Sequence, residues 1–142
     1  MGLFSKLKEL FSKKVIENFQ EFEIEFGKLQ KKTNSEIIAL IGIQGRFKGL
    51  PLIYVSNEEE SLRKYSARVT ELVDPLKRIS EEKQIKDVVI YYEDSILLYK
   101  PLLKSISFFA VNSNKNNIPL LQQWVLEKEQ VLRELFHDTI SG

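Results

Sequence analysis

Two kinds of hydrophobic pattern alternate along this chain. Apolar residues spaced by three and four positions predict amphipathic helices over residues 3–32, 62–79 and 118–135. Short runs of consecutive apolar, β-prone residues predict strands at residues 37–43, 50–55, 88–92, 96–99 and 106–111, with Pro101 marking a break after the fourth. The predicted order is therefore helix, two strands, helix, three strands, helix.

The links between strands determine how the predicted sheet is built. Short links join the first strand to the second, and the third to the fourth and fifth, which only antiparallel neighbours permit. Most strands are apolar at successive positions, so helices must cover both faces of the sheet. Pro51, near the start of the second strand, indicates a strand at the edge. We therefore predict an α/β (α+β) three-layer sandwich around a five-stranded antiparallel sheet.

The central helix is the most clearly marked element. Ser56 or Asn57 can cap its start, with Glu59 and Glu60 three residues further on. Pro75 is expected to bend the helix near its end. Six apolar residues fall on one stripe at 100° per residue, and we expect this stripe to be buried. They are Leu62, Tyr65, Val69, Leu72, Leu76 and Ile79.

Beside this stripe, Ser66, Ala67, Thr70 and Val73 form a band of small or apolar residues, which would let another helix approach closely. If two copies of the helix crossed antiparallel near Thr70, Ser66 would face Val73 of the second copy. Arg63 would then lie near Asp74 of that copy. An exposed charge pair is worth at most about 1 kcal/mol, so apolar burial would have to supply the association.

The first fourteen residues are predicted to form an amphipathic helical extension (1–14) ahead of a single domain (15–142). The extension sets apolar side chains against Lys6, Lys8, Lys13 and Lys14, a pattern typical of helices at anionic membrane surfaces. Docking on this domain or on a partner is the alternative. The apolar residues of this membrane or partner docking surface are Leu3, Phe4, Leu7, Leu10 and Phe11.

Composition narrows the possible functions. The 142 residues carry 21 lysines and arginines against 20 acids, so the chain lacks the basic field of nucleic-acid binders. It has no cysteine, which excludes disulfides and thiolate metal sites and fits a cytoplasmic location. No apolar run approaches the roughly 18 residues that a membrane span needs. We expect a cytoplasmic protein. Any association with a membrane would depend on residues 1–14.

Residues with catalytic potential are sparse. His137 is the only histidine and stands near the end of the last helix, without a carboxylate or nucleophile at catalytic spacing. Gly42, Gly45 and Gly49 do not follow a phosphate-loop pattern and are predicted to serve turns. The glutamates 58–60 suit a helix start and have no second ligand cluster. We therefore expect a protein that is not an enzyme and that has no cofactor and no metal.

Several weak motifs stand in one order. They are Gly49-Leu50-Pro51-Leu52, the helix that starts at Ser56, the strand ending in Pro101-Leu102, and Phe108-Phe109-Ala110-Val111. In this arrangement residues 18–137 resemble the roadblock family, whose founder is a dynein light chain. Longin-like and profilin-like domains share the layered design but order their helices differently.

The resemblance implies a fold and a function. It implies that the first and last helices lie on one face of the sheet and the central helix on the other. It also implies a dimer in which central helices pair antiparallel and sheets join at the third strand. Roadblock proteins are non-catalytic platforms or regulators for Ras-like small GTPases, or adaptors in larger complexes. For this chain the expected dimer interface comprises Arg63, Ser66, Ala67, Thr70, Val73, Asp74, Lys77, Val88, Ile90 and Tyr92.

Three functions follow as hypotheses. The first is a homodimeric module that binds or regulates a Ras-like small GTPase, and Arg46 in the first hairpin is the one candidate for an arginine finger. The second is a structural adaptor that pairs with a different roadblock chain. The third is a peripheral membrane protein that acts through its first helix.

Overall fold

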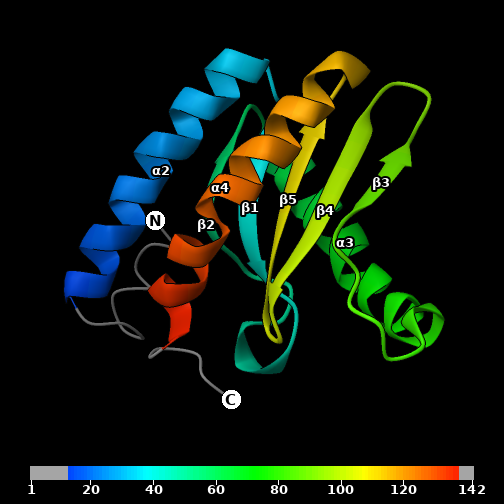
Figure 1. Cartoon of the computed structure of the whole chain (residues 1–142). Helices are drawn as coiled ribbons and strands as arrows, with labels where there is room; N and C mark the ends of the chain where they lie inside the picture. The colour runs from blue at the N-terminus through cyan, green and yellow to red at the C-terminus, as the bar shows by residue number, and fades with distance from the viewer. Residues whose placement is uncertain (1–12, 138–142) are drawn as a thin grey trace.

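The structure is a computed structural model that describes residues 13–137, with side chains from 17 to 136. Three long helices and five strands follow one another in the predicted order, with two short 3-10 helices in the connections (Figure 1). The elements are α2 (Lys13–Thr33), β1 (Ile37–Gly42), η1 (Gly45–Phe47), β2 (Pro51–Ser56), α3 (Glu59–Ser80), β3 (Val88–Tyr91), β4 (Ile96–Leu103), β5 (Ile106–Asn112), η2 (Lys115–Asn117) and α4 (Ile118–His137).

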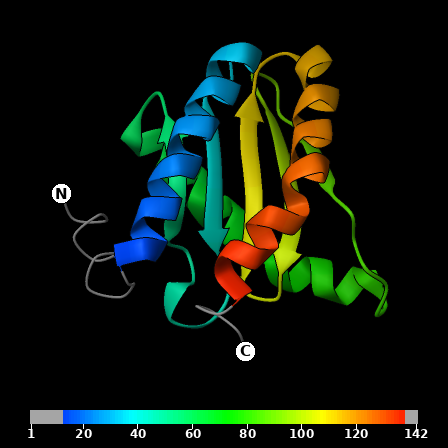
Figure 2. The same cartoon turned by 60° about the vertical axis from the view of Figure 1, so that its left-hand side comes forward.

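The five strands form one antiparallel sheet in the order β2-β1-β5-β4-β3, so β2 and β3 are its edges. The edge position predicted for the second strand from Pro51 is confirmed. Helices α2 and α4 lie side by side over one face, and α3 crosses the other face (Figures 1 and 2). The three-layer sandwich expected from the sequence is confirmed.

Two hydrophobic cores explain why the strands are apolar at successive positions. Ile38 and Leu40 of β1 point into the core beneath α2 and α4. Their neighbours Ile37, Ala39 and Ile41 point into the second core, beneath α3. Successive side chains of a strand leave opposite faces, so a strand covered on both sides needs apolar residues at every position.

Three local predictions were wrong. The fourth strand continues through Pro101 to Leu103, and its register with β5 shifts between these two residues. Helix α3 has Glu58 as N-cap without a side-chain cap, because the Ser56 hydroxyl donates to the Glu58 carbonyl oxygen at 2.7 Å instead. Ile79 was expected to be buried but is 71% exposed, because it lies in the last turn of α3 at the margin of the apolar stripe.

Candidate functional site

The two flanks of α3 lie over different parts of the sheet. On one flank the Arg68 guanidinium stacks 5.0 Å from the ring centre of Tyr65 and 5.1 Å from that of Tyr92, just after β3. The hydroxyls of Tyr65 and Ser95, which lies in the β3–β4 turn, are 2.8 Å apart. This flank therefore faces the β3 edge of the sheet.

Between this flank and β3 lies a surface that is apolar and only partly covered. Leu72 of α3 and Val88, Ile90 and Tyr92 from the β3 segment are half-buried and pack on the core beneath α3. Ile79 extends the same flank of α3 into solvent. We call this surface the α3–β3 face, and it comprises Arg68, Leu72, Ile79, Val88, Ile90 and Tyr92.

The chemistry of the α3–β3 face is that of a contact surface. The arginine over two aromatic rings supplies a fixed positive charge at one end, and such stacks favour a defined arginine geometry. The half-exposed aliphatic side chains of Val88 and Ile90 lie on β3, an edge strand. The outer side of an edge strand carries backbone N–H and C=O groups that no neighbouring strand of the sheet pairs. Edges of this kind are templates for pairing with another strand.

Three of the predicted interface residues of the central helix, Arg63, Ser66 and Thr70, lie on its other flank. Thr70 stands beside Gly49, where an added Cβ would be 3.8 Å from the Thr70 hydroxyl oxygen. Arg63 and Ser66 line a hollow together with residues 49–51 and Tyr54, next to β2. The structure thus places these side chains toward β2, whereas the predicted β3 residues lie at the opposite edge of the sheet.

The predicted interface residues of α3 also differ in how exposed they are. Arg63, Ala67, Asp74 and Lys77 are exposed, and Thr70 is half-buried. Ser66 is 3% and Val73 7% exposed, and Val73 packs in the core beneath α3. The expected contact of Ser66 with Val73 of a second copy would join two side chains that one copy already covers almost completely.

Sequence reasoning missed three residues of the α3–β3 face. Leu72 and Ile79 were assigned to the buried stripe, and Arg68 was not among the expected interface residues. Their position at the margin of the stripe was a usable signal, since residues at a stripe's edge are the ones left half-covered. Which margin lies next to β3 depends on how the helix crosses the sheet.

Other candidate residues lie apart from this face. The guanidinium of Arg46, in η1, stacks on its neighbour Phe47 at 5.1 Å from the ring centre. Burial, followed by the charges of Glu59 and Glu23, raises the pKa of Tyr54. Within residues 13–137 no three histidine, cysteine or acidic side chains come together as a metal site.

The five predicted docking residues precede the described part of the chain. Leu3, Phe4, Leu7, Leu10 and Phe11 lie outside the described residues, so membrane or partner docking by this segment stays a prediction. The predicted domain boundary after residue 14 falls within α2. None of the described helices is both long enough and apolar enough to cross a membrane.

Comparisons with known proteins bear on the fold. No family model matches the chain, and no curated protein sequence does. Among solved structures, Myxococcus xanthus MglB superposes with a TM-score of 0.71 at 10% identity, covering 87% of this chain and 93% of that one. The gliding protein MglB from Thermus thermophilus gives 0.64 at 13% identity, covering 81% and 88%. A structure of MglB with tetrameric arrangement gives 0.66 at 13% identity, covering 84% and 91%.

The chain has the roadblock fold. The element order, the antiparallel sheet and the placement of the helices all agree with the family resemblance of residues 18–137. At identities of 10% to 13% these superpositions establish the fold alone. The functional argument for this chain must come from its own surface.

Proposed function

We propose that this roadblock protein is a non-catalytic module that forms a homodimer and binds or regulates a Ras-like small GTPase. The GTPase role comes from the roadblock resemblance, whose fold the chain has. The observation that carries the dimer is the α3–β3 face, where half-buried apolar side chains adjoin an edge strand.

A two-fold contact at this face satisfies both of its features. Antiparallel pairing of β3 with β3 of a second copy would join two five-stranded sheets. The β3 edge of each copy would then be paired. The same contact would cover Leu72 and Ile79 on α3, whose apolar surface supplies most of the free energy of association. A structure of MglB described as tetrameric supports self-association of this fold.

This geometry revises which α3 residues would meet the partner. The flank of Arg68, Leu72 and Ile79 lies on the β3 side, whereas Arg63 and Thr70 lie toward β2. Val88, Ile90 and Tyr92 keep the place in the proposed interface that was expected for them from the resemblance.

The dimer is tested by sedimentation of the full chain across a concentration series. Ile79→Glu changes a side chain that is 71% exposed, so the fold is expected to tolerate it. The dissociation constant should rise about a hundredfold, since each of two isoleucines loses about 1.5 kcal/mol of burial. The matched control is Ile24→Glu on α2, where the isoleucine is 62% exposed on the opposite side of the sheet.

Two outcomes would contradict the proposed dimer. Equal weakening by Ile24→Glu would mean that the substitution acts through general charge, not through the α3–β3 face. A wild-type chain that stays monomeric at every concentration would remove the homodimer. Dimerisation only after addition of a second roadblock chain would support the adaptor alternative.

The GTPase role is tested by retention of the protein on immobilised Ras-like small GTPases from the same organism, loaded with GDP or with a non-hydrolysable GTP analogue. Retention in at least one state is expected. A parallel measurement with Ile79→Glu shows whether the GTPase recognises the dimer. Absence of retention in both nucleotide states would refute the GTPase role and leave the dimer standing.

A further inference from the structure

A second surface, distinct from the α3–β3 face, lies at the end of the molecule where the β4–β5 turn meets the end of α3. It is an open groove of about 220 Å³. Its floor consists of apolar side chains from four segments of the chain, among them Ile43, Val73, Leu76, Tyr99 and Leu103. We call it the lysine-rimmed groove, because Lys77, Lys83 and Lys104 stand around this floor.

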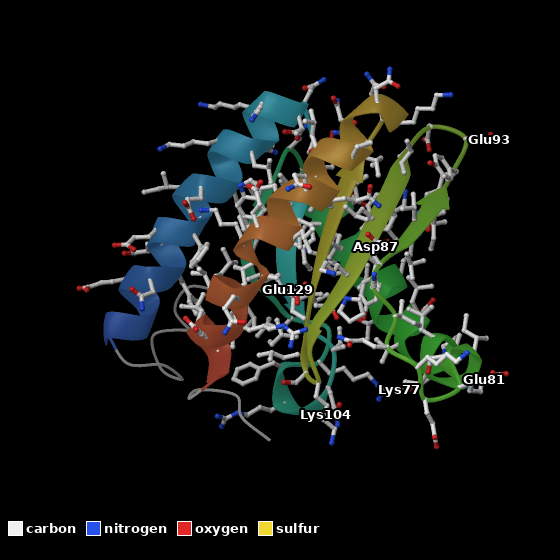
Figure 3. All side chains as sticks on the ribbon, in the orientation of Figure 1. Lys77, Glu81, Asp87, Glu93, Lys104 and Glu129 are labelled. Atoms are coloured by element: carbon white, nitrogen blue, oxygen red, sulfur yellow. The ribbon has the colours of Figure 1, made fainter. Side chains whose placement is uncertain are left out.

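The charge of the rim has one sign. All three lysines are exposed, and none of them forms an ion pair with a described residue. No acidic side chain is among the described residues that line the groove. Figure 3 shows Lys77 and Lys104 at the same end of the molecule, although they come from α3 and from the turn after β4. Like charges gathered around an apolar floor favour an anionic, amphipathic occupant.

The loop that carries Lys83 has an unusual backbone. Glu81 and Glu82, directly before it, have φ angles of +51° and +69°, in the left-handed region that non-glycine residues adopt rarely. These two residues turn the chain so that Lys83, Gln84 and Ile85 form one wall of the groove. Such a conformation persists only where the surrounding structure holds it.

We propose that the lysine-rimmed groove binds a short segment of a partner protein that carries two adjacent aliphatic side chains followed by acidic residues. The aliphatic side chains fill the floor and the carboxylates meet the lysines. The volume lies below the roughly 300 to 1,000 Å³ of sites that enclose small molecules, and the groove is open. It therefore suits side chains presented by a larger partner better than it suits a whole ligand.

The probe is the peptide Leu-Leu-Glu-Asp-Glu, labelled with fluorescein at its amino terminus. The full chain is titrated with it to about 1 mM, with anisotropy and amide NMR as readouts. Amide shifts are expected in residues 83–85 and 99–104, which lie outside the dimer face, and not in Val88–Tyr91 of that face. Replacing both leucines of the peptide by serine, or its acids by lysine, should abolish binding. Shifts confined to other residues, or no shift at all, would overturn the proposal.

A charge reversal tests the rim. Lys83→Glu combined with Lys104→Glu is expected to weaken peptide binding about tenfold or more. Lys28→Glu combined with Lys115→Glu changes net charge equally at exposed sites outside the groove and should leave binding within about twofold. Equal weakening of peptide binding by both double variants would overturn the proposal, because it would show that the peptide is attracted by net charge and not bound at the groove. If decanoate caused the same amide shifts and the peptide did not bind, the proposal would be overturned in favour of a fatty acid as the occupant of the groove.

Discussion

Asn112, the last residue of β5, connects the end of α2 to the loop after β5 through its buried side-chain amide. Its Nδ2 donates to the carbonyl oxygen of Thr33 at 2.9 Å and to the hydroxyl of Ser35 at 3.0 Å. Its Oδ1 accepts from the backbone N–H of Asn114 at 2.8 Å. Asn112 is 1% exposed, so its two bonds to Thr33 and Ser35 form away from water. Replacement of Asn112 by alanine should therefore loosen the end of α2 from the sheet.

The expected loss follows from the partners that remain. Each of the three hydrogen bonds has a net value of about 1 kcal/mol. The Thr33 carbonyl keeps a bond from Asn117 Nδ2 at 2.7 Å, and the Ser35 hydroxyl keeps the Thr33 hydroxyl at 2.6 Å. Neither is left unpaired, so the full desolvation penalty does not apply. Asn112→Ala should lower the free energy of unfolding by about 2 to 4 kcal/mol.

The assay is urea denaturation followed by circular dichroism, with unchanged m-values taken as evidence for an intact fold. Asn112→Asp should cost at least as much, because a carboxylate oxygen would then face the Thr33 carbonyl in a buried site. Asn116→Ala, at an exposed position four residues on, is the control and should change stability by less than about 0.5 kcal/mol. A loss below about 1 kcal/mol for Asn112→Ala would refute the reasoning.

Three further substitutions test the packing. Gly42→Ala would place a Cβ 2.2 Å from the Phe47 carbonyl oxygen and should lower the free energy of unfolding by about 1 to 3 kcal/mol; a neutral result in chemical denaturation would contradict this geometry. Ser66→Ala removes a buried hydroxyl that has no hydrogen-bond partner among the described residues, and it should be neutral or raise stability by up to about 1 kcal/mol; a thermal melt showing clear destabilisation would reveal a partner. Tyr99→Phe breaks the 2.8 Å bond to Ser107 and should cost about 1 kcal/mol at neutral pH. Burial raises the pKa of Tyr99, and the bond to Ser107 opposes this shift. The difference in free energy of unfolding between wild type and Tyr99→Phe should therefore be complete below about pH 10 and disappear as pH rises through the folded-state pKa. A constant difference in denaturation experiments at pH 8 to 11.5 would exclude this linkage.

Much of the architecture could be predicted because the chain's local patterns agree with its tertiary structure. Runs such as residues 37–41 are apolar at every position, and each side of the strand has its own core. Pro101 was misleading because a proline ordinarily interrupts a strand. Here the strand shifts its register with β5 just after Pro101, and β3 no longer pairs beside it, so the missing N–H is tolerated.

The candidate site could be predicted only in part, and α3 shows why. A helical wheel separates the stripe of Tyr65 and Val69 from two margins, one with Thr70 and one with Arg68. The wheel contains no information on how the helix is oriented over the sheet. Sequence alone therefore does not say which margin of the helix faces which edge of the sheet. That choice is made by the strand order β2-β1-β5-β4-β3, which puts β3 at the opposite edge from the strand that enters α3. Because Arg68 contacts Tyr92 and Thr70 stands beside Gly49, the proposed interface, which uses both α3 and β3, is built on the Arg68 margin.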